Sequence, residues 1–71
     1  MHLKNEKETK EAIETWRSAS TIVQLSNLRK ALESLELDQM HYEQKEHARG
    51  IERCKLSLAL LQRRIAELEP Q

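Results

Sequence analysis

Residues 51 to 68 read IERCKLSLALLQRRIAEL, and their apolar side chains recur at alternating spacings of three and four. Because an α-helix turns by about 100° per residue, this spacing gathers them along one side of a helix. A helix with one apolar side has to bury that side against another element. The apolar seam predicted for this helix consists of Ile51, Cys54, Leu58, Leu61, Ile65 and Leu68.

A second apolar seam lies earlier in the chain and can cover the first. It consists of Leu25, Leu28, Leu32 and Leu35. Two seams of similar length can face one another only if the chain reverses between them. The leucine spacing stops at Leu35, and Asp38 can cap a following helix. We therefore predict an all-α, coiled-coil-like antiparallel hairpin with helices near residues 5 to 36 and 39 to 68; one long helix is the structural alternative.

The first of these helices is predicted to begin at Asn5, because Glu8 three residues later completes a capping-box pattern. Its early apolar stripe, around Ile13 and Trp16, points about 140° away from the Leu25 to Leu35 seam. Residues 18 to 21, Ser-Ala-Ser-Thr, are weak in helix interiors and good at helix ends. Two alternatives stay open, a continuous first helix and one that breaks near residues 18 to 21.

The length of the chain limits the core that it can build alone. Its 71 residues form at most a single small helical domain, residues 1 to 71. A chain this short buries only about 60% of the surface that its unfolded form exposes. The single cysteine excludes an internal disulfide. We therefore expect a second copy or a partner protein to complete the core.

The charge balance bears on the class of partner. Twelve basic and twelve acidic residues give a formal net charge of zero, so no long-range field draws the chain to nucleic acid or to an anionic membrane. The longest apolar run, residues 58 to 61, is far shorter than the roughly 20 residues of a membrane span. No secretory signal is recognisable at the start. The sequence predicts a cytoplasmic protein that binds other proteins.

A second group of interface residues lies away from the seam of the helix predicted for residues 39 to 68. Leu56 and Leu60 are roughly opposite that seam. Tyrosine and arginine around exposed leucines dominate the binding energy of many protein interfaces, although single surface leucines are also common. The predicted partner-binding residues are Tyr42, Lys45, Arg49, Arg53, Leu56, Leu60 and Arg64.

Metal, cofactor and catalytic sites are not expected. Met40, His47 and Cys54 are each seven residues apart, which places them about 10 Å from one another on a helix, too far to share an ion within one chain. The chain has no glycine-rich phosphate loop and no ordered Ser, His and Asp set. Its one glycine, Gly50, marks either a close approach of another backbone or a weak point in the helix.

Two classes of function fit these patterns. The first is a non-enzymatic adaptor, inhibitor or small chaperone that captures a helix of another protein around Leu56 and Leu60. Its size and hairpin plan, over residues 25 to 65 with Tyr42 and an apolar C-terminal helix, resemble the small co-chaperones of type III secretion needle subunits in architecture. The second is a homodimeric four-helix-bundle regulator of phage or plasmid type acting on nucleic acid, similar in plan to small plasmid RNA-binding bundles.

Overall fold

The computed structural model describes residue 3 and residues 5 to 69. These residues form three helices, α1 (Glu6–Trp16), α2 (Thr21–Gln44) and α3 (Ala48–Leu68), and the described part of the chain contains no strand. The prediction of an all-helical fold is confirmed. Within this part of the chain, none of the helices combines the length and the apolar character needed to cross a membrane.

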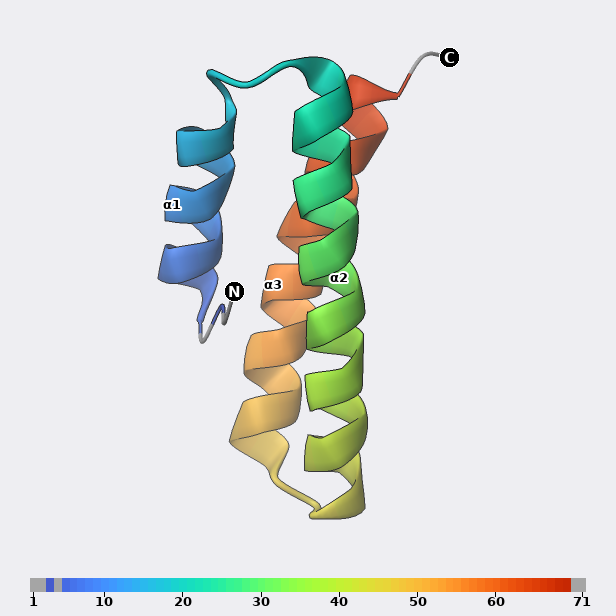
Figure 1. The fold of residues 1–71 in the computed structure, drawn as a ribbon. Helices are drawn as coiled ribbons and strands as arrows, with labels where there is room; N and C mark the ends of the chain where they lie inside the picture. The colour runs from blue at the N-terminus through green and yellow to red at the C-terminus, as the bar shows by residue number, and fades with distance from the viewer. Residues whose placement is uncertain (1–2, 4, 70–71) are drawn as a thin grey trace.

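The helix α3 lies between the other two helices. The helices α2 and α3 run side by side in opposite directions, and α1 lies along the second half of α3 and parallel to it (Figure 1). The helix α1 packs mainly against α3 and touches α2 little. Both sides of α3 are therefore covered within one chain, one along its whole length and the other along half of it.

The predicted first helix is broken, so the continuous alternative is wrong. Asn5 caps the start of α1 by accepting a hydrogen bond from the backbone N–H of Glu8 at 2.8 Å, as the sequence predicts. The helix ends at Trp16, and Ser20 caps α2 by accepting from the N–H of Val23 at 3.2 Å. The break allows the stripe of α1 to pack on α3, which a straight helix would aim elsewhere.

The predicted boundary between residues 36 and 39 is also wrong, because α2 continues to Gln44. Asp38 lies inside α2 and caps no helix. Residues 36 to 44 contain no glycine or proline, so nothing local ends the helix there. The reversal occurs at residues 45 to 47, where Glu46 adopts a left-handed φ of 54° and Nδ1 of His47 accepts from the N–H of Gly50 at 2.9 Å. Histidine is not among the preferred capping residues, so this turn carries little sequence signal.

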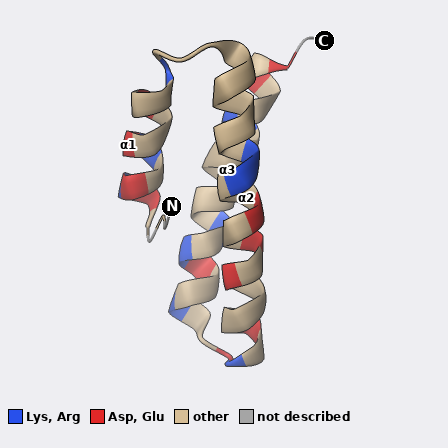
Figure 2. Cartoon of the chain, viewed as in Figure 1, with Lys and Arg blue, Asp and Glu red and all other residues tan. Residues whose placement is uncertain are grey.

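Charged side chains separate between α2 and α3 near this turn. From residue 31 to residue 44 the chain contains no lysine or arginine, and its charged residues there are Glu33, Glu36, Asp38 and Glu43. The first half of α3 instead carries several basic residues (Figure 2). One acidic residue, Glu52, lies among them, so the first half of α3 is basic on balance and faces an acidic stretch of α2.

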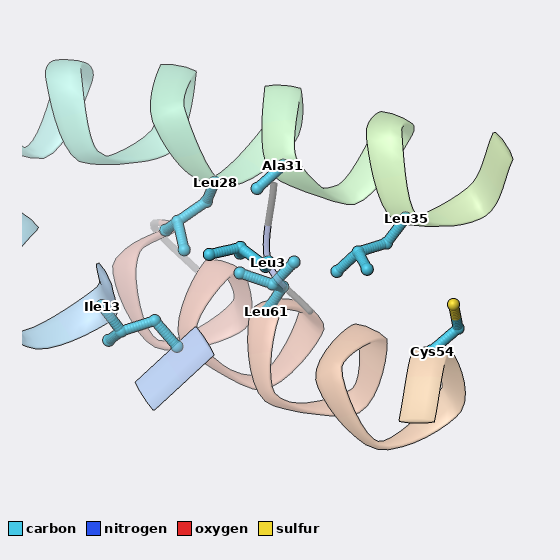
Figure 3. Packing of buried hydrophobic residues seen from close by; sticks show 7 residues of the cluster. All are labelled: Leu3, Ile13, Leu28, Ala31, Leu35, Cys54 and Leu61. Carbon is cyan, nitrogen blue, oxygen red and sulfur yellow. The ribbon is translucent and has the colours of Figure 1, made fainter. Parts of the chain in front are cut away.

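The core forms where the three helices meet. Leu28 of α2 and Leu61 of α3 have only 1% and 0% of their surface exposed, and Leu3 lies close to both (Figure 3). Of the ten predicted seam residues, Leu28, Leu35, Cys54 and Leu61 are buried, and Leu25, Leu32, Ile51, Leu58, Ile65 and Leu68 are partly buried. Leu3, Ile13 and Ala31 complete the buried apolar cluster.

A buried polar contact fastens α1 to α3. The hydroxyl of Thr9 donates to Oγ of Ser57 at 2.9 Å, and it also lies 3.0 Å from the carbonyl oxygen of Asn5. Both hydroxyl-bearing residues are almost completely buried. A buried hydroxyl without a partner costs about 1–3 kcal/mol. This pair therefore favours one position of α1 along α3.

The pair can be tested with a double-mutant cycle in urea. Thr9→Val keeps the shape but leaves the hydroxyl of Ser57 buried without its partner, so the free energy of unfolding should fall by about 1–3 kcal/mol. Adding Ser57→Ala removes that stranded group and should recover part of the loss. Additive losses from the two changes would show that the hydroxyls do not act as a pair.

Candidate partner-binding surface

The seven predicted partner-binding residues do not form one exposed face. Lys45, Arg49 and Arg53 are exposed, and Leu56 has 44% of its surface exposed. Tyr42, Leu60 and Arg64 are partly buried. The helix α1 covers the C-terminal half of α3 and so divides the predicted face in two.

Leu60 belongs to the side of α3 that α1 covers. It packs against the core, and together with Ile13 and Lys10 of α1 it lines a shallow groove between the two helices. The sequence places Leu60 on a second apolar side of this helix, and α1 of the same chain partly covers that position. Leu60 is therefore partly buried by α1 and lines this groove.

Arg64 links α3 to α2. Only 13% of its side chain is exposed. Its Nη2 donates to Oε1 of Gln24 at 3.0 Å, and its Nη1 lies 3.4 Å from a carboxylate oxygen of Glu67. Gln24 in turn donates to the carbonyl of Ala19 at 2.9 Å, so the guanidinium is tied through α2 to the loop that follows α1. The Nε of Arg64 is buried and has no hydrogen-bond partner among the described residues.

The exposed remainder of the predicted face lies on the first half of α3. We call Arg49, Arg53 and Leu56 the basic flank. An α1 of 11 residues covers about 16 Å of an α3 whose 21 residues span about 31 Å. Because Thr9 meets Ser57 and the two helices run parallel, α1 begins beside about residue 54 of α3 (Figure 1). About two turns of α3 are therefore open before α1, and they carry Arg49 and Arg53, while Leu56 lies level with the start of α1.

The two arginines of the basic flank are unpaired within the described part of the chain, since neither Arg49 nor Arg53 has an acidic group within ion-pair distance there. By contrast, Arg17 pairs with Glu14 at 2.7 Å and Arg29 pairs with Glu69 at 2.7 Å. Guanidinium groups bind carboxylates with two parallel hydrogen bonds. The unpaired arginines are therefore available to an external anion.

A pocket of about 190 Å³ adjoins the basic flank. We call it the Tyr42 pocket; it lies between α2 and α3 at the end of the core where Leu35 and Cys54 face one another (Figure 3). Its lining residues are Leu3, Leu35, Asp38, Tyr42, Gly50, Arg53 and Cys54. Arg53 belongs to both features, so the pocket and the basic flank form one continuous site.

Gly50 shapes this pocket through Tyr42. A Cβ atom at Gly50 would overlap the ring of Tyr42, so the glycine lets the ring lie directly against the first turn of α3. The ring centroid of Tyr42 is also 5.2 Å from that of His47, which caps the same turn. The close approach that Gly50 indicated is therefore made by a side chain of α2.

Burial and the charges around the pocket shift the pKa of Cys54. Burial raises the pKa of its thiol above the ordinary value of 9.0; the carboxylate of Asp38 adds to this rise and Arg53 opposes it. The thiol is therefore neutral at physiological pH and acts as a small apolar wall. No cluster of three or more His, Cys, Asp or Glu side chains that could hold a metal ion occurs among the described residues.

Sequence reasoning missed Leu3 and Asp38 as parts of the site. Neither lies on the helix face that carries the predicted residues, so helical periodicity could not group them with Arg53. Gly50 was the usable signal, because a lone glycine in a helix indicates that something packs closely. Comparisons of the chain with protein-family models, with curated proteins and with solved structures gave no match.

Replacing Gly50 by Ala tests the contact with Tyr42. Alanine is normally the better helix former by about 1 kcal/mol. Here the displaced tyrosine ring should cost about 1–3 kcal/mol, so Gly50→Ala should lower the free energy of unfolding in urea. In a Tyr42→Ala background the same change should become neutral or stabilising.

Ala59→Gly, at an exposed position of α3, is the matched control for helix propensity. It should lower the free energy of unfolding by about 1 kcal/mol in either background. Stabilisation by Gly50→Ala in the wild-type background would show that the ring does not need the space.

The raised pKa of Cys54 predicts a loss of stability in alkali. Between the ordinary thiol pKa of 9.0 and the higher native value, the unfolded chain loses its proton while the native chain keeps it. The free energy of unfolding should therefore fall with rising pH in this window, by at most about 1.4 kcal/mol per pH unit. Cys54→Ala removes the thiol, so its free energy of unfolding should decline less steeply with pH. Some decline remains because both chains share the other titrating groups. Equal slopes would contradict the prediction.

Proposed function

We propose that this chain is a non-enzymatic interaction module that binds one helix of another protein at the basic flank of α3. The observation that carries the proposal is Leu56, which is 44% exposed beside two arginines that have no acidic partner in the described residues. Apolar side chains surrounded by arginine are typical of interface centres. In this proposal α2 and α3 act as an antiparallel hairpin scaffold, and α1 limits the open part of the site to about two turns of α3.

The intramolecular packing of α1 supports this function over an obligate homodimer. A hairpin of two helices would need a second copy to cover α3, but α1 already covers half of that side. The large exposed apolar residues of the described chain are scattered over both ends of α2 and one position of α3 rather than aligned as one seam. They are Ile22, Val23, Leu37, Met40 and Leu56.

The proposal can be tested by selecting helical peptides from a randomised display library. Peptides selected on the wild-type chain should bind a Leu56→Asp variant at least about tenfold more weakly, a loss of about 1.4 kcal/mol. The variant should keep its thermal stability because Leu56 is substantially exposed. Light scattering on the same samples should give the mass of one chain for both proteins.

Leu60→Asp provides the contrasting control. Leu60 packs against the core, so this change should lower the melting temperature, unlike Leu56→Asp. A wild-type dimer that Leu56→Asp converts to a monomer would contradict the proposal and favour the homodimeric bundle. Selected peptides that bind Leu56→Asp as well as the wild type would exclude the basic flank as the binding site.

A further inference from the structure

We infer that the partner helix is acidic: its carboxylates pair with Arg49 and Arg53 while one leucine or single-ring aromatic side chain enters the Tyr42 pocket. This inference rests on the proposed function and specifies the chemistry of the partner. It follows from the charge of the basic flank, the size of the pocket and the spacing of the side chains between them.

The charge of the basic flank determines the sign of the charge that a partner helix should carry. Arg49 and Arg53 are exposed and have no ion pair within the described chain, while the acidic residues from Glu33 to Glu43 lie on α2 (Figure 2). The first half of α3 also carries one exposed carboxylate, Glu52, against these two arginines and Lys55, so its balance is basic. An acidic helix gains charge-assisted hydrogen bonds here, and a basic helix is repelled. A second copy that presented the same flank would place arginine against arginine, so self-pairing of this surface is disfavoured.

The size of the Tyr42 pocket selects its occupant. Its volume of about 190 Å³ is well below the roughly 300–1,000 Å³ of small-molecule sites. A cavity of about 150 Å³ holds a benzene molecule. One leucine or phenylalanine side chain therefore suits this space, and a larger ligand does not.

The lining of the pocket favours an apolar group over an ion. Leu35, Tyr42 and the neutral thiol of Cys54 provide apolar walls. Asp38 and Arg53 line the same pocket with opposite charges that offset one another. An anion gains little inside the pocket, whereas the exposed guanidinium of Arg49 attracts a carboxylate beside it.

The spacing of the residues fits a helix that lies along α3. Arg49 and Arg53 are four residues apart, about 6 Å along the helix axis, and Leu56 follows within one further turn. Two carboxylates four residues apart on a partner helix match this separation. The open length of about two turns accommodates two carboxylates at this spacing. Anchoring by one apolar side chain between two ion pairs follows from this arrangement.

The sharpest experiment compares what the wild-type chain and a charge-reversed variant select from the same library. The variant carries Arg49→Glu and Arg53→Glu at exposed positions, and Arg49→Glu alone, which leaves the lining of the Tyr42 pocket unchanged, is measured beside it. The wild-type chain should enrich peptides with Asp or Glu four residues apart around one Leu or Phe. The variant should enrich Lys or Arg at the same positions. Exchanged pairs should bind about tenfold or more weakly, a loss of about 1.4 kcal/mol.

The pocket is tested from both sides. Replacing the anchor Leu or Phe of a selected peptide by Ala should weaken its binding to the wild-type chain about tenfold. Cys54→Leu fills the pocket and should also weaken the original peptide, provided that its helical circular dichroism matches that of the wild type. The peptide change leaves the protein untouched, so it tests the pocket even if Cys54→Leu unfolds. Binding that survives loss of the anchor would overturn the pocket assignment.

The outcomes separate the inference from the function on which it rests. Neutral or basic peptides that depend on Leu56 would overturn the acidic partner and leave the interaction module standing. Failure to enrich any peptide over Leu56→Asp would overturn both. A fluorescein-labelled RNA hairpin that binds more tightly than the selected peptides, with affinity falling steeply with salt, would overturn the inference in favour of nucleic acid.

Discussion

The structure depends on the burial of α3 between two other helices. Leu61 at its centre is completely buried, and Ser57 one turn earlier is hydrogen-bonded to Thr9 of α1. The helix α2 covers one side of α3 by antiparallel packing, and α1 covers half of the other. Since a single hairpin would leave this second side open, the position of α1 determines how much surface α3 offers to a partner.

The length of α1 sets the limits of the candidate site. It partly covers Leu60, while Arg49, Arg53 and Leu56 stay exposed. At the same end of the molecule, the reversal after Gln44 brings the tyrosine ring of α2 against a helix turn that has no side chain at Gly50. The pocket and the arginines therefore adjoin one another because α1 packs on only part of α3 and because Tyr42 packs on Gly50.

Local patterns predicted more of the fold than of the site. Asn5 caps α1 as expected, and the weak helix formers at residues 18 to 21 coincide with the break. The reversal was misplaced because α2 ends at a turn with Glu46 in a left-handed conformation and a histidine cap, neither of which is a usual turn signal. Grouping Leu60 with Leu56 was reasonable from helical phase, since phase records direction around one helix but not what covers it.

Helical character, the aim of each apolar stripe and the presence of interface-type residues on α3 follow from the sequence alone, because they depend on residues within a turn or two of one another. Tertiary packing settles which of those residues remain exposed. Thr9 meets Ser57 across 48 residues and Gln24 meets Arg64 across 40, and these contacts place the cover over α3. Helical periodicity does not predict contacts between residues so far apart in the sequence, since these contacts form only when the helices bury their apolar sides together.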